Sequence, residues 1–225
     1  MIDNPTPTPR RSFLTRLALL TAPIAGARLT AHTRQAATPG QPAQSNQEWL
    51  RRLTGKHRTM FDVEKHRNGH GLGQEISMLE VWRRDYRLEP PNVNLVLGMR
   101  GTGIPILLSD ALWTRFRLGE QYEVAKPGTK DAYAVNPFSA ANGSAGLVTA
   151  EQTVEALQRR GVTFLACRNT IAAASKRLSA AGFGTPEDVQ QAIEGGLLPG
   201  VILVPAMLIA FTQMQERGVS YIYAG

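Results

Sequence analysis

The sequence predicts an α/β fold: a three-layer open sheet, mostly parallel, with helices on both faces. Short apolar runs alternate with helical patterns from about residue 46 to residue 225, which is typical of parallel strands joined by helical crossovers. Runs such as 92–99 contain enough apolar residues for a buried strand. The roughly 180 residues suffice for one domain with a full core, but they are too few for a barrel of eight strand–helix units.

In the first half of this region, helical spacing of Leu72, Ile76, Leu79 and Trp82 predicts a helix over 72–86. Pro90-Pro91 introduces the buried strand at 92–99. The other elements expected here are a helix at 46–53, a strand at 56–63 and a helix at 104–116.

Residues 117–147 contain several Gly and Pro breakers and predict a long irregular segment of the functional or contact-forming kind. Thr149 and Gln152 have the spacing of a capping box that opens a helix to Arg160. The remaining expected elements are a strand at 162–167, a helix ending before Gly182, a helix from Thr185-Pro186, a strand at 201–204, a helix at 206–217 and an edge strand at 219–223.

The N-terminus has the pattern of an export signal. Arg10-Arg11 precedes Phe13-Leu14, an apolar stretch follows, and Ala25-Gly26-Ala27 fits a signal-peptidase site. We therefore expect a twin-arginine signal peptide at 1–27, a flexible linker at 28–45 and the α/β domain at 46–225, with the folded protein exported to the periplasm. The alternative is a basic disordered tail.

Composition limits the partners. The formal net charge is +7, and removal of residues 1–27 leaves 22 basic and 17 acidic residues dispersed along the chain. Nucleic-acid binding needs clustered basic residues with interleaved aromatics, so we expect no nucleic acid as partner. No stretch is long and apolar enough for a stable membrane span. No cofactor motif is present, and we expect no cofactor.

Cys167 is the only cysteine, so an internal disulfide is excluded. It ends the apolar run 162–166 and precedes a helical pattern, at the strand end where α/β proteins bind ligands. A helix start and the adjacent Arg168 favour a thiolate. The alternative is an inert buried Cys that packs as a small hydrophobe.

Two further patterns are weaker. Gly98–Gly103 joins a strand to a helix, but its glycine spacing is not the dinucleotide fingerprint; we interpret it as a turn lining the same cleft as Cys167, with Arg100 as an anion contact. His66 and His70 have the spacing of a helical metal pair, yet Asn68-Gly69 breaks a helix, so we prefer a surface loop and expect no metal site.

Three segments together resemble the DsrE/DsrF-like family: 161–169 around Cys167, 196–201, and 214–222 with its Gln-Glu-Arg-Gly sequence. The resemblance covers roughly 56–225 and is to the exported branch of that family. It implies a three-layer α/β fold in homo- or hetero-oligomers, often trimers or hexamers. In sulfur-trafficking members a Cys accepts sulfur as a persulfide, and Cys167 matches it.

We therefore expect a periplasmic sulfur carrier or sulfurtransferase-like protein whose Cys167 thiolate is the persulfide acceptor. Arg168 lowers the thiol pKa in this hypothesis, and Asn169 and Thr170 donate hydrogen bonds to the sulfur or a bound oxyanion. Its partners are a small sulfur compound or a sulfur-accepting protein. The alternatives are a non-enzymatic oligomeric binding or accessory module with Cys167 as core packing, and a redox sensor.

Overall fold

A five-stranded parallel sheet forms the centre of the protein in the computed structural model, which describes residues 47–225 apart from the side chains of 143–145. The strand order is β4-β3-β2-β1-β5, and every neighbouring pair is parallel. The strands are β1 (His57–Val63), β2 (Val93–Met99), β3 (Thr163–Cys167), β4 (Ile202–Val204) and β5 (Ser220–Tyr223). The last strand lies at an edge, as the sequence predicts, and it pairs with the first strand.

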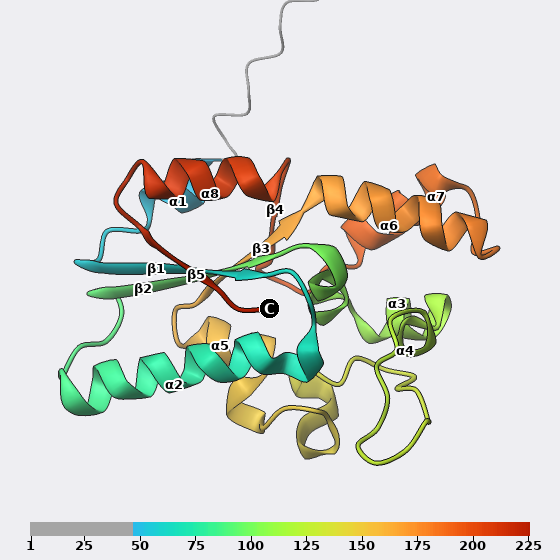
Figure 1. The fold of residues 1–225 in the computed structure, drawn as a ribbon, viewed down its shortest axis with the longest axis horizontal. Coiled ribbons are helices and arrows are strands. Elements are labelled where there is room, and N and C mark those ends of the chain that lie inside the picture. Colours follow the sequence, from blue (N-terminus) through green and yellow to red (C-terminus); the bar gives the residue numbers. More distant parts are fainter. Residues whose placement is uncertain (1–46) are drawn as a thin grey trace, which may run out of the picture. The chain divides into compact units, whose positions relative to one another are not determined.

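Helices cover both faces of the sheet (Figure 1). One face carries α1 (Glu48–Arg51) and α8 (Met207–Gln215), and the other carries α2 (His70–Asp85) and α5 (Val154–Arg159). Four more helices lie towards the ends of the strands: α3 (Asp110–Phe116), α4 (Leu118–Gln121), α6 (Arg168–Ala180) and α7 (Pro186–Gly195). This arrangement confirms the α/β prediction. None of the described helices is long and apolar enough to span a membrane.

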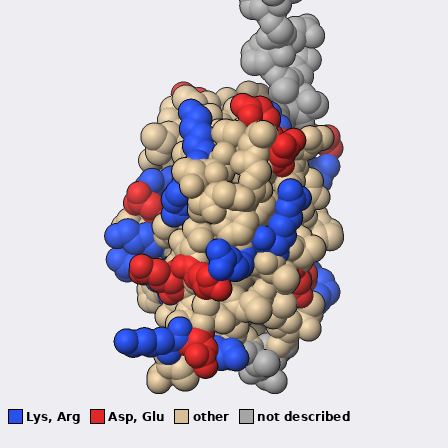
Figure 2. Space-filling view, turned by 90° about the vertical axis from the view of Figure 1, so that its right-hand side faces the viewer, with Lys and Arg blue, Asp and Glu red and all other residues tan. Residues whose placement is uncertain are grey.

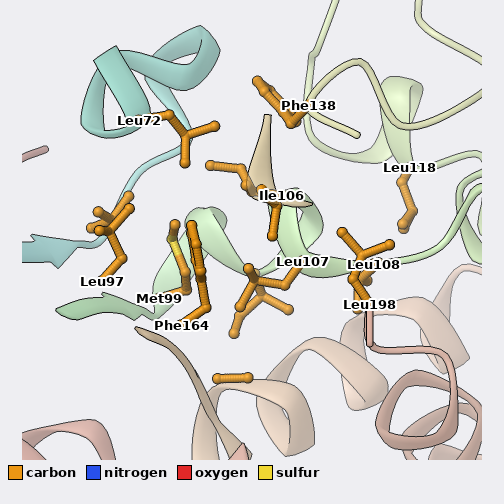
Figure 3. Close-up of a cluster of buried hydrophobic side chains, with 14 of the residues drawn as sticks. Leu72, Leu97, Met99, Ile106, Leu107, Leu108, Leu118, Phe138, Phe164 and Leu198 are labelled. Carbon is orange, nitrogen blue, oxygen red and sulfur yellow. The ribbon is translucent and has the colours of Figure 1, made fainter. Parts of the chain in front are cut away.

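Alternation along the strands divides the core into two clusters, because successive side chains of a strand point to opposite faces. The larger cluster lies towards α2 and includes Leu97, Met99 and Phe164 of the strands (Figure 3). Ile106 and Phe138, which lie outside the strands, belong to the same cluster. The smaller cluster lies towards α8 and includes Met60, Val96, Leu165 and Cys167. We call them the α2-side core and the α8-side core.

The helix expected at 104–116 is wrong in its first half. The chain forms a 3-10 helix at Gly101–Leu107, Leu108 is extended, and α3 begins only at Asp110. The carbonyls freed by this break have side-chain partners: Trp113 Nε1 donates to Pro105 O, and Asn136 Nδ2 donates to the carbonyls of Ile106 and Leu108. A buried carbonyl with such a donor does not need a helical partner.

The predicted capping box is present at Thr149 and Gln152, but it opens only a 3-10 turn at Ala150–Gln152. Thr153 then acts as a second N-cap, and its side chain accepts from Ala156 N at 3.3 Å, so α5 starts at Val154. The single helix expected here is therefore divided into a 3-10 turn and α5, each with its own N-cap residue, Thr149 and Thr153. The predicted signal peptide and linker lie outside the described residues.

Candidate functional site

Cys167 ends β3 and is the N-cap residue of α6, as the sequence predicts. Its side chain belongs to the α8-side core, and the residue is only 5 % exposed. The surrounding side chains include Leu165, Val204 and Met207. The thiol therefore lies at the carboxyl edge of the sheet, beneath the first turn of α8.

The polar neighbour of the thiol is a backbone amide. Met207 N, at the first position of α8, donates to Cys167 Sγ at 3.4 Å. The N-cap residue of α8 is Ala206, whose side chain cannot accept a hydrogen bond from the helix. Cys167 thus supplies, from another strand, an acceptor that the sequence of α8 lacks.

Arg100 follows β2 directly and forms the centre of a charged network. Its Nε donates to Asp62 Oδ1 at 2.8 Å and its Nη2 donates to Asp62 Oδ2 at 3.0 Å, while Nη1 lies 3.0 Å from Glu64 Oε1. Asp62 is almost completely buried. The hydrogen bond to Asp62 is the main cause that raises the pKa of Arg100.

Two tyrosines of the edge strand complete this network. Tyr221 donates its hydroxyl to Asp62 Oδ2 at 2.7 Å, and Tyr223 donates to Glu64 Oε2 at 3.0 Å. Burial, followed by the bond to Asp62, raises the pKa of Tyr221 to about 12. The bond from Tyr223 is the main cause that lowers the pKa of Glu64. We call these five residues, Asp62, Glu64, Arg100, Tyr221 and Tyr223, the edge network.

Strand register places one member of the edge network, Arg100, next to Cys167 at the carboxyl edge of the sheet. Met99 of β2 pairs with Ala166 of β3; Arg100 is the residue that follows β2, and Cys167 is the last residue of β3. Sequence reasoning found Arg100 and Cys167 but missed Asp62, Glu64 and the tyrosines. The available signal was that Asp62 and Glu64 follow an apolar strand, where α/β proteins place functional side chains.

The other predicted site residues, Arg168, Asn169 and Thr170, form the first turn of α6. Arg168 Nε lies 3.2 Å from Glu194 Oε1 of α7, and Asn169 N donates to Pro205 O at 3.2 Å. Asn169 is exposed and Thr170 is half-buried. Within residues 47–225, no hydrogen bond joins the side chain of Arg168, Asn169 or Thr170 to the thiol.

The glycines of Gly98–Gly103 are explained by packing. A Cβ at Gly101, whose φ is +53°, would lie 2.5 Å from Glu64 O, and one at Gly103 would lie 2.6 Å from Val63 O. The turn is therefore pressed against the end of β1, and Arg100 N and Gly103 N donate to Val63 O and Glu64 O. Only glycine permits this close backbone approach.

His66 and His70 do not form a pair on one helix. His66 precedes a left-handed turn; its Nδ1 accepts from Asn68 N, and its Nε2 lies 3.0 Å from Tyr122 O. Burial lowers the pKa of His66. The part of the chain that the structure describes holds no group of three potential metal ligands.

Charges of both signs are mixed on the side of the molecule at which the strands end (Figure 2). Arg168–Glu194 and Arg117–Glu120 are two of the ion pairs near this end. The site is thus not surrounded by a field of one sign, and any charge selectivity must come from the edge network itself.

Comparison with known proteins gives no functional assignment. No protein-family model and no curated protein matches the chain. Among solved structures, the chain is similar to a protein of unknown function from Methanobacterium thermoautotrophicum. The two are 17 % identical, the match covers 74 % of this chain and 98 % of that one, and the TM-score is 0.41.

Proposed function

We propose that the protein is a sulfur carrier of the DsrE-like kind, exported to the periplasm, in which Cys167 holds sulfane sulfur as a persulfide. The export and linker parts of this proposal depend on the sequence pattern of residues 1–45 alone. The carrier part depends on the position of Cys167 at the carboxyl edge of a parallel sheet, where α/β proteins place their chemistry.

The observation that carries the proposal is the hydrogen bond from Met207 N to Cys167 Sγ. An N–H donor at a helix start stabilises a sulfur anion through both the bond and the positive end of the helix dipole. A persulfide is also an anion when it is deprotonated, so the same surroundings favour the loaded and the empty carrier.

The reaction in this proposal needs no redox partner. The Cys167 thiolate attacks the outer sulfur of a donor persulfide R–S–SH, a new S–S bond forms, and the donor S–S bond breaks. The donor leaves as the thiol R–SH, with the proton that the persulfide carried or one from water. Transfer to an acceptor thiolate repeats the same exchange in the other direction.

The direct test is intact-mass analysis after incubation with a small persulfide donor. We expect the wild type to gain one sulfur atom and to lose it on treatment with a reducing thiol. We expect Cys167→Ser to gain none. Wild type that never gains sulfur, or Cys167→Ser that gains it equally, contradicts the proposal.

A matched pair of variants tests the role of the amide. Met207→Pro removes the N–H, and proline is tolerated at the first position of a helix; Met207→Ala keeps the N–H and removes most of the same side chain. We expect slower alkylation of the thiol at neutral pH in Met207→Pro than in Met207→Ala. Equal rates would show that the bond does not activate the sulfur.

A second candidate function is favoured by the burial of the thiol. At 5 % exposure and with apolar neighbours, Cys167 also fits the packing of a non-enzymatic oligomeric binding or accessory module. On α8, Leu208 and Ile209 are 66 % and 59 % exposed, which favours a contact with another subunit. Alkylation of Cys167 only after denaturation, with no sulfur uptake, would support this function over the carrier. Native mass spectrometry would count the subunits.

A further inference from the structure

A basic pocket lies at the opposite end of the sheet from Cys167. It has a volume of about 300 Å³ and lies between α1, the start of β1 and the segment after α8. Three of its lining residues are arginines and three are apolar: Arg51, Arg58, Arg217, Leu50, Leu53 and Val219. Among residues 47–225, no carboxylate lines it.

The arginines of this pocket are not neutralised by the described part of the chain. Within residues 47–225, neither Arg51, Arg58 nor Arg217 forms an ion pair. The neighbouring Glu48 pairs with Arg52 instead, at 2.6 Å. Unpaired guanidinium groups that face one cavity repel each other, and a bound anion removes that repulsion.

Arg58 gives the second, independent observation. Its Nε is buried and has no hydrogen-bond partner among the described residues. A buried charged donor without a partner is costly. Because this nitrogen is closed to solvent, a ligand oxygen in the pocket can accept its hydrogen bond only if the guanidinium group turns towards the pocket.

Capping of α8 does not account for these arginines. Cations do favour the carboxyl end of a helix, but Thr212 O, Met214 O and Gln215 O of α8 already accept backbone N–H groups of residues 216–219. Neither an ion pair nor helix capping within the described part of the chain therefore occupies the three guanidinium groups.

We propose that this pocket binds a tetrahedral oxyanion such as a phosphate group, with Arg51, Arg58 and Arg217 as its ligands. Guanidinium donors match the oxygens of phosphate in geometry and charge. Leu50, Leu53 and Val219 provide apolar surface for the organic part of a phosphate ester. The ligand is either a free phosphate compound or the headgroup of an anionic lipid.

The test is titration of the full chain with inorganic phosphate, at constant ionic strength set with sodium chloride, while the arginine Nε–H signals are followed by NMR. We expect the Arg58 signal to shift with a saturable curve. Arg217→Gln and Arg51→Gln, both at exposed positions, should each weaken binding by about tenfold. Arg87→Gln, an exposed arginine outside the pocket, is the matched control and should bind as wild type.

Two vesicle samples distinguish the source of the phosphate. Flotation with phosphatidylglycerol but not phosphatidylcholine vesicles, reduced by Arg217→Gln and not by Arg87→Gln, identifies a lipid headgroup. Saturable phosphate binding without such flotation identifies a free phosphate compound. A linear, non-saturating shift, or equal affinity in the pocket variants and the wild type, would overturn the proposal.

Discussion

The two faces of the sheet differ in what their side chains do. The α2-side core joins strands, helices and the long loop region into one cluster, with Trp113, Phe116 and Phe138 fully buried. The α8-side core is smaller and rich in sulfur, with Met60, Cys167, Met207 and Met214. Of the helices in residues 47–225, α1 and α8 cover it.

Polar groups follow the same division. Alternation along β1 places Arg58 and Asp62 on the same face as Met60. The basic pocket and the edge network therefore both lie on the face of the sheet that α1 and α8 cover, next to the α8-side core. This suggests that the α2-side core supplies most of the stability, while the other face presents the charged groups and the thiol.

The largest difference is expected from one substitution made on both faces. Leu97 and Leu165 are both fully buried, on neighbouring strands, but they belong to the α2-side core and the α8-side core respectively. Truncation of a buried leucine to alanine costs about 2–5 kcal/mol, and less where the surroundings can collapse. We expect Leu97→Ala near the upper end and Leu165→Ala near the lower end, measured by urea unfolding. A larger loss for Leu165→Ala would reverse the comparison.

The second expected effect concerns the edge network. Asp62→Asn removes the buried carboxylate that pairs with Arg100 and leaves this guanidinium only the more exposed Glu64, so it should cost about 3 kcal/mol, the lower end for breaking a buried ion pair. Glu64→Gln is the matched control: Glu64 contacts the same Arg100 but is much more exposed, so its loss should be smaller. Equal losses in thermal unfolding would show that burial does not set the strength of these contacts.

The third substitution tests how closely α8 approaches the sheet. A Cβ at Gly98 would lie 2.5 Å from Phe211 and 2.7 Å from Met207 Sδ, so Gly98→Ala overpacks the α8-side core. We expect a cost of about 1–3 kcal/mol in urea unfolding. Gly195→Ala, where the added carbon would meet no other part of the described chain, is the control and should not lower the stability.

The smallest effect is a pH dependence within α2. Glu75 is completely buried and has no hydrogen-bond partner within residues 47–225, and this burial raises the pKa of its carboxyl well above 4.5. The unfolded chain therefore releases this proton first, and the wild type loses stability relative to Glu75→Gln as the pH rises above 4.5. Urea unfolding at several pH values measures this difference.

Glu80 on the same helix provides a control of opposite sign. Its hydrogen bond from Arg83 is the main cause that lowers its pKa. Its contribution to the free energy of unfolding is therefore present above pH 4.5 and is lost as the pH falls. If Glu75→Gln and Glu80→Gln follow the same pH trend, folding does not raise the pKa of Glu75 and the prediction is wrong.

Local patterns were enough to predict much of this fold. Apolar runs and helix signals located β3 and α6 and placed Cys167 between them, because strand burial and helix capping depend on neighbouring residues. The break at Leu108 could not be predicted in this way. It is stabilised by Asn136, whose side-chain amide donates to the backbone carbonyls of Ile106 and Leu108, which lie 30 and 28 positions away in the sequence.

The edge network escaped prediction for the same reason. Tyr221 and Asp62 are 159 positions apart, and they meet only because β5 pairs with β1. Strand order is a property of the whole sheet, so the residues of β1 and of β5 do not indicate that these two strands pair. The amide of Met207 at the thiol likewise depends on where α8 crosses β3.

The pairing of β5 with β1 also has a consequence for how the chain folds. Contacts across so many residues are slow to form, since a long loop must close before they stabilise anything. Until β5 arrives, β1 has an open edge that offers its backbone groups to any other strand. Asp62 is a buried charge at that edge, so an apolar strand from another molecule would leave its carboxylate without a hydrogen-bond donor. Pairing with β5 supplies that donor, the hydroxyl of Tyr221.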